Sequence, residues 1–463
     1  GNLYKEKFYY VEVFYMEVPL EDIYHLLETN QLNKVREILV DLQPVDIAEL
    51  FEEMSKEQSL KLFRILPKSL SADIFSYLSS DKQQEIIENI TDEEIRNIVN
   101  DMFIDDTVDF IEEMPANIVD KILQNTSSDM RNLINQFLRY PENSAGSVMT
   151  VEYLSLKNDM NIGQALHSIK RFGIDNETID ICYIIDNQRK LVGYISLKKL
   201  IFLDDDVPLR EAMETNFVSC HTTDDQENIA SDFRKYDLTS MPVVDNEDRL
   251  VGIITIDDVV DVIDQENTED MQKMAAMAPS DEEYLKESVF SLVKQRIGWL
   301  LILMILATFT GIIIRTYEGV LQSAIVLISF IPMLMSTGGN AGSQSSMLIT
   351  RGIALEEIEL SDIGMIFWKE LRVSVIIGVV LSVVNFLIIY YLSDINFAVS
   401  FAISLSLFIT IIIAKVVGST LPIIAKGLKL DPAIIASPFI TTIIDACALI
   451  VFFLVCTHYL HLA

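Results

Sequence analysis

Residues 330–354 read FIPMLMSTGGNAGSQSSMLITRGIA, a membrane-length apolar segment that becomes rich in glycine and polar residues halfway along. Gly338, Gly339 and Gly342 allow neighbouring helices to approach closely or the backbone to unwind. Backbone that breaks at membrane depth must be buried in protein or line a wet cavity, because hydrocarbon cannot satisfy free N–H and C=O groups. The stretch therefore predicts the wall of a polar pathway, with helix packing through small residues as the alternative.

Apolar segments long enough to cross a membrane surround this stretch. Five spans are predicted, at about residues 297–317, 319–349, 372–393, 397–424 and 434–460. Basic residues gather on one side of these spans, at Lys294, Arg296, Arg351, Lys369, Arg372, Lys426 and Lys429, and Arg315 is the main basic residue on the other. By the positive-inside rule, we expect a multi-pass protein of the cell membrane with its N-terminal half in the cytoplasm and its C-terminus outside.

The charge of the chain is divided between its two halves. From Tyr284 onward ten basic side chains balance ten acidic ones, so the net charge of −33 belongs to residues 1–283, with 25 basic and 58 acidic side chains. Such an acid excess argues against nucleic acid as a partner and favours cations. The four cysteines lack metal or disulfide spacing, and no nucleophile, phosphate-loop or zinc motif is evident, so no enzyme activity is predicted.

Residues 21–140 predict an α-superhelical domain. Four segments align at a step of about 24 residues, one helix pair each: PVDIAELFEEM from Pro44, PKSLSADIFSYL from Pro67, TDEEIRNIVNDM from Thr91 and PANIVDKILQNT from Pro115. Each unit must bury its apolar face on the next one. Residues 1–20 precede this domain; they are broken by charges, do not form a signal peptide and receive no role.

A second repeat occupies residues 144–201 and 207–263. Its halves end in IDICYIIDNQRKLVGYISLKKLI and LTSMPVVDNEDRLVGIITIDDVVDVI, which share an apolar strand, an acidic turn, a short strand and a helix. The pattern resembles a tandem cystathionine-β-synthase (CBS) domain pair of β-α-β-β-α units, which commonly binds adenine nucleotides such as ATP. Thr255 and Asp258 fit the Thr-x-x-Asp pattern in the second copy, whereas Ser196-Leu-Lys-Lys199 lacks the acid, so at most one nucleotide site is implied.

An acidic segment, residues 264–290, follows the CBS pair. Most of its acids lie at helical spacing, and so acidic a linker is not attracted to anionic lipid; it must face water, a basic surface or bound cations. Oxygen ligands without histidine or cysteine favour Mg²⁺ or Ca²⁺ over zinc or copper.

The membrane segments also resemble a known family. STGGNAGSQSS (residues 336–346) followed by RGIA, and DPAIIASPFITTIIDA (residues 431–446), are similar to motifs of the MgtE family of magnesium channels and transporters, and the resemblance covers about residues 25–463. It implies a multidomain membrane protein with a helical N domain, an α/β CBS pair, a connecting or plug helix at 264–290 and an all-α domain of five transmembrane helices at 291–463.

Asp445 is an isolated acid in the last span, where a charge costs about 3 kcal/mol on insertion scales unless it meets water or a partner. Mg²⁺ is usually held by one or two carboxylates with neutral oxygens completing its shell. We therefore expect a pore site at Asp445, Thr441, Ser437 and Asn340. In the resembled family the matching aspartate is the selectivity residue of a pore between two subunits, which implies a homodimer. Glu318, Glu370 and Asp431, at span ends, are expected to be solvated or salt-bridged.

The resemblance further implies that cytoplasmic Mg²⁺ closes the pore by bridging the helical domain, the CBS pair and the connecting helix. The matching acids are Asp105, Asp109, Asp225, Glu227, Asp237, Asp258, Asp261, Glu266, Glu269 and Asp270. The alternative interpretation is that these acids only keep the domain soluble. Two other functions stay open: transport of another divalent cation, Mn²⁺ or Co²⁺, and a CBS-regulated intramembrane protease or receptor. Asp431 and Asp445 lie in one stretch and do not suggest a protease dyad.

Overall fold

The structure, a computed structural model, describes residues 23, 25–27, 29, 31–280, 284–285, 287–393, 395–435 and 437–461. The N-terminal extension assigned to residues 1–20 lies outside them, as do the linker acids Asp281, Glu282 and Glu283. The chain divides into two compact units, Gly1–Val260 and Asp261–Ala463. We call them the N-terminal unit and the membrane unit, and each is described by itself.

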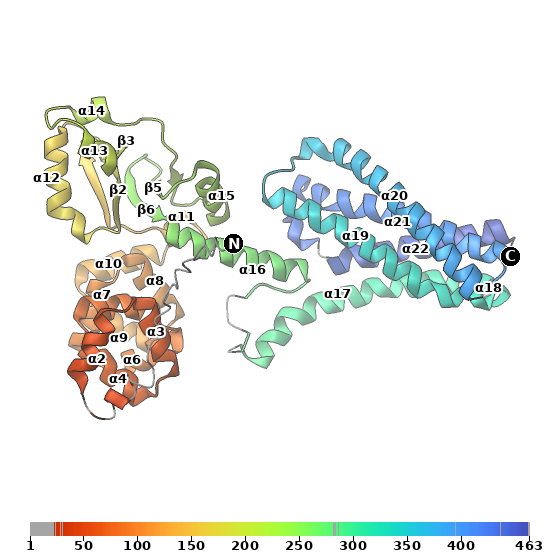
Figure 1. The fold of residues 1–463 in the computed structure, drawn as a ribbon, viewed down its shortest axis with the longest axis horizontal. Coiled ribbons are helices and arrows are strands. Elements are labelled where there is room, and N and C mark those ends of the chain that lie inside the picture. Colours follow the sequence, from red (N-terminus) through yellow and green to blue (C-terminus); the bar gives the residue numbers. More distant parts are fainter. Residues whose placement is uncertain are drawn as a thin grey trace, which may run out of the picture. The chain divides into compact units, whose positions relative to one another are not determined.

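Short helices follow one another from residue 32 to residue 137 of the N-terminal unit (Figure 1). They are α2 (Leu32–Val40), α3 (Pro44–Glu53), α4 (Lys56–Ile65), α5 (Lys68–Ser76), α6 (Ser80–Asn89), α7 (Asp92–Asp101), α8 (Ile104–Glu113), α9 (Ala116–Asn125) and α10 (Ser128–Phe137). The four aligned repeat segments coincide with α3, α5, α7 and α9. Odd-numbered helices contact the next odd-numbered one, and α4, α6, α8 and α10 do the same, so the predicted superhelical stacking is confirmed.

Aromatic rings continue from one repeat to the next in the core of this stack. Phe51, Phe63, Phe75 and Phe110 form successive edge-to-face pairs with centroids 6.3, 6.2 and 5.0 Å apart. Such pairs add packing specificity to the burial of apolar area. Helix starts are fixed locally: at α7, Thr91 accepts a hydrogen bond from Glu94 N while the Glu94 carboxylate accepts one from Thr91 N.

The CBS pair repeats one β-α-β-β-α order twice. The first copy has β1 (Tyr153–Lys157), α12 (Ile162–Phe172), β2 (Thr178–Ile185), β3 (Leu191–Ser196) and α13 (Leu197–Phe202); the second has β4 (Cys220–His221), α15 (Gln226–Tyr236), β5 (Ser240–Val244), β6 (Leu250–Thr255) and α16 (Ile256–Met274). Each sheet has one parallel and one antiparallel strand pair. Short helices α11 (Ala145–Val148) and α14 (Leu209–Ala212) precede the two copies. A buried hydrogen bond of 2.8 Å between the Tyr183 and Ser240 hydroxyls joins the copies.

Helix α16 is longer than a CBS helix needs to be. It runs without interruption from Ile256 to Met274, so the last CBS helix and residues 264–274 of the expected connecting helix are one element. The connecting helix was predicted to continue to residue 290, but α16 ends at Met274 and the next helix starts only at Val289. The first residues of α16 belong to the N-terminal unit and its residues from Asp261 onward belong to the membrane unit.

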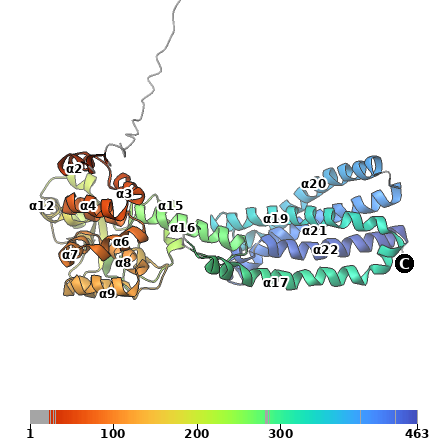
Figure 2. The ribbon, with the colours of Figure 1, turned by 90° about the horizontal axis from the view of Figure 1, so that it is seen from below.

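Among the described residues of the membrane unit, five helices are long and apolar enough to cross a membrane. The elements are α17 (Val289–Thr316), α18 (Glu318–Ser323), η2 (Ile325–Phe330), α19 (Ile331–Ala354), η3 (Leu360–Asp362), α20 (Ile363–Leu392), α21 (Phe397–Gly427), η4 (Pro432–Ile434) and α22 (Ser437–Leu460). Figure 2 shows α17 at the edge of the bundle, where it contacts α22.

The predicted span 319–349 is wrong in its limits. The chain breaks at Ala324 between α18 and η2, and the regular helix α19 starts only at Ile331 but continues to Ala354. Pro332 in the first turn of α19 explains the start, since proline has no N–H to donate and its φ suits that position. The helix passes through the glycine-rich stretch without unwinding, so these glycines serve close packing and not a backbone break. Span 372–393 likewise begins earlier, at Ile363.

Candidate functional site

Asp445 lies on α22, which is otherwise apolar around it. Its side chain is half-buried, and its Oδ1 atom is buried without a hydrogen-bond partner among the described residues. An unpaired carboxylate oxygen at this depth costs free energy unless water or a cation satisfies it. The donor set therefore fits a hard cation.

Hydroxyl groups join α22 to α19 on the N-terminal side of Asp445. Ser437 Oγ donates to Ser343 Oγ over 2.8 Å, and Ser343 Oγ lies 3.3 Å from Thr441 Oγ1. Thr441 Oγ1 itself donates to the Ser437 carbonyl. The structure thus brings Ser437 and Thr441 together through Ser343, one to two helical turns before Asp445.

Asn340, the fourth predicted pore residue, belongs to a polar stripe on α19. Ser336, Asn340 and Gln344 recur at four-residue spacing and are exposed on the single chain. Lipid is a poor environment for such amides. The stripe is separate from the Ser343 hydroxyl cluster, and no hydrogen bond is found between Asn340 and Asp445 within the part of the chain that the structure describes.

Glycines set the close approach of α19 to its neighbours. A Cβ atom at Gly339 would lie 2.7 Å from Thr441 Cγ2, and one at Gly342 would lie 2.0 Å from Ile444 Cδ1. On α21, a Cβ atom at Gly418 would lie 2.2 Å from the Gly342 carbonyl oxygen. Because the Gly418 contact is with the backbone of Gly342, a larger residue at position 418 would move α19 relative to α21.

Lys415 and Glu370 are joined inside the bundle through Ser345, a contact that the sequence did not predict. Lys415, on α21, is only 5% exposed, and its Nζ donates to Ser345 Oγ over 3.1 Å. Ser345 Oγ in turn donates to Glu370 Oε2 on α20 over 2.7 Å. Lys415 has a detectable sequence signal, because it is the one charged residue in the apolar run FITIIIAKVVGST (residues 408–420).

The span-end acids have different environments. Glu318 is exposed, as expected. Asp431 forms the expected salt bridge, with its Oδ2 2.8 Å from Lys273 Nζ, while its Oδ1 caps η4 by accepting from Ala433 N. Glu370, in the third turn of α20, is half-buried and accepts a hydrogen bond from Ser345 Oγ.

A cluster of carboxylates forms within the N-terminal unit between α8, the first CBS copy and the start of α16. Burial, together with the charge of Asp258, raises the pKa of Asp105 to about 9 and that of Asp106 to about 6. Burial and the nearby Glu112 raise the pKa of Asp109 to about 7. Burial and the charges of the α16 acids raise the pKa of Glu177 to about 8. Asp106 and Glu177 were not among the predicted residues.

The remaining predicted regulatory acids have identifiable local contacts. Asp225 caps α15 by accepting from Glu227 N over 2.9 Å, and Asp237 ends the same helix in a left-handed conformation with φ 51°. On α16, Glu269 Oε1 lies 2.6 Å from Lys273 Nζ. Burial and the charge of Asp431 raise the pKa of Asp270. Asp261 and Glu266 lie on the same helix and also have interaction partners.

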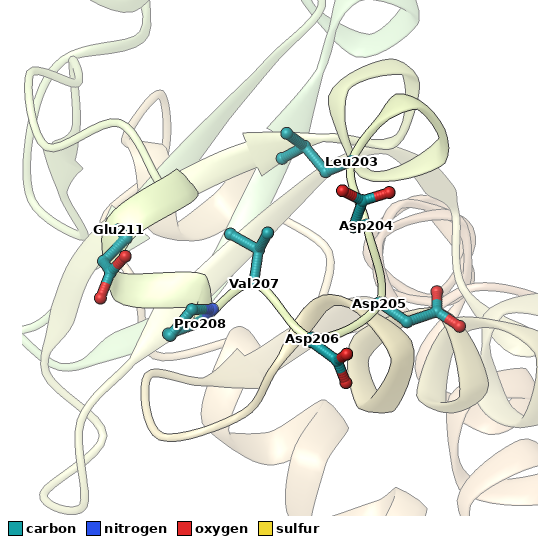
Figure 3. Close-up of a pocket in the computed structure, with 7 residues that line it drawn as sticks. All are labelled: Leu203, Asp204, Asp205, Asp206, Val207, Pro208 and Glu211. Atoms are coloured by element: carbon teal, nitrogen blue, oxygen red, sulfur yellow. The ribbon is translucent and has the colours of Figure 1, made fainter.

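These acids do not form a preorganised metal site in the described part of the chain. Across the described residues, no three Asp, Glu, His or Cys side chains converge closely enough to hold an ion. An acidic pocket in the loop after α13 does not change this, because Figure 3 shows Asp204, Asp205 and Asp206 pointing in different directions. Cation binding by the carboxylate cluster would therefore require side chains to rearrange.

The nucleotide motif is formed locally. Thr255 Oγ1 donates to Asp258 Oδ2 over 2.7 Å at the start of α16. Asp258 also contributes to the carboxylate cluster, so the two predicted functions share one side chain. In the first CBS copy, Ser196 accepts from Lys199 N, and Lys199 pairs with Glu214.

Fold and site together define a polytopic membrane protein with a helical-repeat domain, a CBS pair and an unpaired carboxylate between its spanning helices. Comparison with family models agrees. The MgtE model, described as a divalent cation transporter, matches residues 331–455; the MgtE intracellular N domain matches 42–143 and the CBS domain 209–265. Magnesium transporter MgtE of Thermus thermophilus is 34% identical over 69% of this chain and 70% of its own length. Magnesium transporter MgtE of Bacillus subtilis is 30% identical over 94% of this chain and 96% of its own length.

The chain belongs to the MgtE family of magnesium transporters. Solved structures agree on the N-terminal part. The soluble part of a magnesium transporter is similar with a TM-score of 0.51 and 29% identity, covering 53% of this chain and 97% of the other. The cytosolic domain of the Mg²⁺ channel MgtE in complex with ATP is similar with a TM-score of 0.50 and 32% identity, and the match covers 52% of this chain and 99% of the other.

Proposed function

We propose that this chain mediates Mg²⁺ uptake through a pathway lined by Asp445. The observation that carries the proposal is the buried, unpartnered Oδ1 atom of Asp445 beside the Ser343–Ser437–Thr441 hydroxyls. Mg²⁺ keeps several waters and needs few direct protein ligands, so one carboxylate with neutral oxygens suits a hydrated ion in transit. The relatives named as magnesium transporters support the choice of ion.

The pathway is completed by a second copy of the chain. One carboxylate per subunit cannot balance a divalent charge, whereas a twofold axis would place two Asp445 side chains around one ion. The exposed stripe of Ser336, Asn340 and Gln344 supports a partner or a wet pore on that side of α19. The 28-residue helix α17, none of whose residues is buried, offers further surface for a partner or for lipid.

Cytoplasmic Mg²⁺ closes this pathway by binding the predicted regulatory acids. Like charges a few ångströms apart in partly buried sites repel one another, and a divalent cation relieves that repulsion. The raised pKa values of Asp105 and Asp109 support an uncompensated cluster, which would bind cations in exchange for protons. Ion binding would favour one closed arrangement, as differential affinity for two states requires. The N-terminal half lies in the cytoplasm and the C-terminus outside, in agreement with the distribution of basic residues.

An adenine nucleotide such as ATP binds at Thr255 and Asp258 of the second CBS copy. The hydrogen bond between their side chains holds the carboxylate where it can accept from a ribose hydroxyl. Titration calorimetry should give one ATP site per chain, weakened in Thr255→Val and unchanged in Ser196→Ala. Two equal sites, or equal binding by Thr255→Val, would refute this assignment.

The deciding experiment for the main proposal is ion uptake by the purified full-length protein in liposomes, with Mg²⁺, Ca²⁺, Mn²⁺, Co²⁺ and Na⁺ compared. Mg²⁺ flux should exceed that of the other ions. Preferential Mn²⁺ or Co²⁺ flux would assign another divalent cation to the same pathway. Absence of any cation flux from correctly assembled protein would overturn the proposal.

A further inference from the structure

Lys415 places a positive charge inside the helix bundle that, in the proposed function, conducts cations. It is 5% exposed and lies near the middle of α21, which runs from Phe397 to Gly427. Within the part of the chain that the structure describes, its Nζ atom donates a hydrogen bond of 3.1 Å to Ser345 Oγ. A buried ammonium close to a cation pathway would repel the transported ion unless a negative charge balances it.

Glu370 is the carboxylate that reaches this ammonium, but it does so through a hydroxyl group. Ser345 Oγ accepts from Lys415 and donates to Glu370 Oε2 over 2.7 Å, so one serine joins α21, α19 and α20. A serine hydroxyl has one donor and can accept at the same time, which is the arrangement needed between an ammonium and a carboxylate. Bonds to charged partners are stronger than neutral ones.

The bridge shares one turn of α19 with the hydroxyl cluster of the proposed pathway. Ser345 is two residues after Ser343, so the two side chains leave opposite sides of this turn, and the Ser343 hydroxyl contacts Ser437 and Thr441. Gly342 in the preceding turn packs on the carbonyl of Ala414, the residue before Lys415. The position of the Lys415 charge and the position of the hydroxyl cluster are therefore fixed by the same turn of α19.

We propose that the Glu370–Ser345–Lys415 bridge neutralises the buried Lys415 charge beside the cation pathway and thereby helps to determine its preference for divalent over monovalent cations. Glu370 and Ser345 are positioning residues, which act on the ion through Lys415 and α19. This inference rests on the proposed function, because it assumes that cations pass along α19.

The inference makes a prediction that depends on ion charge. If Glu370→Gln exposes the ion to the Lys415 charge, the repulsion is twice as large for Mg²⁺ as for Na⁺ at the same place. A fall of about tenfold in Mg²⁺ flux should then accompany a fall of only about threefold in Na⁺ flux measured without divalent ions. A purely structural role would lower both fluxes by the same factor.

The test uses liposomes containing the full-length protein, with Mg²⁺ flux and divalent-free Na⁺ flux measured for wild type, Glu370→Gln, Lys415→Gln and the double variant. Assembly is checked by size-exclusion chromatography. We expect the unequal loss in Glu370→Gln, and substantial recovery when Lys415→Gln is added. Matched controls are Glu357→Gln and Lys369→Gln, which change exposed charges, and Ser374→Ala, whose hydroxyl bonds to the Leu371 carbonyl of its own helix.

Ser345→Ala keeps both charges and removes only the bridge, so it provides a second test if Glu370→Gln does not assemble. It should show the same bias against Mg²⁺ at smaller amplitude. Equal loss of both ions, or no recovery in an assembled double variant, would overturn the inference. Absence of Mg²⁺ flux from wild type would instead refute the proposed function, so the two failures are distinguishable.

Discussion

Lys273 Nζ lies 2.8 Å from Asp431 Oδ2, which joins the last turn of α16 to η4, the short helix directly before α22. Lys273 also pairs with Glu269, and hydrogen bonds to these two acids raise its pKa although burial opposes the shift. Arg351 on α19 adds a longer bond, 3.4 Å, to Asn267. Within the membrane unit, Lys273 of α16 and Arg351 of α19 thus connect the C-terminal part of α16 to the spanning region, next to the helix that carries Asp445.

Removing this cation should weaken closure. In Lys273→Met, Asp431, Glu269 and Asp270 lose their shared counter-ion and repel one another. A partly exposed ion pair contributes about 0.5–1 kcal/mol, so the internal Mg²⁺ concentration giving half inhibition should rise about twofold to fivefold. Flux from liposomes loaded with graded Mg²⁺ measures this midpoint. Lys294→Met, an exposed change on α17, is the control, and a lowered midpoint in Lys273→Met would contradict the prediction.

Packing between α19 and α21 should not tolerate a methyl group at Gly418. Its Cβ would lie 2.2 Å from the Gly342 carbonyl oxygen, so the two helices would have to separate. Overpacking of this kind costs about 1–3 kcal/mol. Gly418→Ala should lower the melting temperature of the detergent-solubilised protein and reduce flux. Gly311→Ala is the matched control, because nothing lies within 4 Å of its added Cβ; equal melting of both variants would contradict the packing.

The carboxylate cluster of the N-terminal unit predicts a particular dependence on pH. Burial and the Asp258 charge raise the pKa of Asp105 from 3.8 to about 9, so the folded state holds protons that the unfolded state releases. Stability of the metal-free protein is therefore greatest below about pH 4 for this group and is lost as pH rises toward 9. Mg²⁺ replaces those protons, so its stabilising effect should increase with pH.

Thermal unfolding of the full-length protein between pH 6 and 9, with EDTA or with Mg²⁺, measures both effects. In EDTA the melting temperature should fall as pH rises. The increase in melting temperature that Mg²⁺ produces should be larger at pH 9 than at pH 6. Asp105→Asn combined with Asp109→Asn should flatten both slopes, whereas Asp120→Asn, an exposed change on α9, should not. A melting temperature in EDTA that rises with pH over this range would be inconsistent with the buried cluster.

Sequence reasoning was sufficient where a pattern repeats or persists over many residues. The 24-residue step predicted the stacking of α3, α5, α7 and α9, the doubled strand pattern predicted two β-α-β-β-α units, and apolar length predicted five spans. These features depend on periodic burial, which is visible in one dimension. The break at Ala324 was not predicted from the sequence, because η2 is as apolar as the helix that follows it.

Some site residues are visible in a local sequence pattern, whereas others are brought together only by packing. Asp445 stands out as a lone acid in an apolar run, and Ser437 and Thr441 follow from helical spacing. Glu370 and Lys415 are 45 positions apart and meet only through Ser345 on a third helix, so no local pattern pairs them. Asp106 and Glu177 belong to the N-terminal carboxylate cluster for the same reason: packing of α8 near the CBS pair, and not sequence spacing, places them there.

Asp445 itself gives the sharpest test of the pathway. Asp445→Ala removes the only carboxylate in the middle of α22 and leaves hydroxyls and carbonyls, which bind Mg²⁺ weakly in competition with its own hydration shell. Mg²⁺ flux should fall to the background of empty liposomes, while the melting temperature should stay the same or rise, because the unpaired Oδ1 atom is lost.

Asp445→Asn separates charge from ligation at the same position. An amide oxygen can still contact a cation but does not balance its charge, so Mg²⁺ flux should be lost while monovalent flux is retained or increased. Glu318→Gln, an exposed acid at a span end, should conduct Mg²⁺ like wild type. Wild-type Mg²⁺ flux through assembled Asp445→Ala would show that the ion takes another route, and the pathway along α19 and α22 would have to be abandoned.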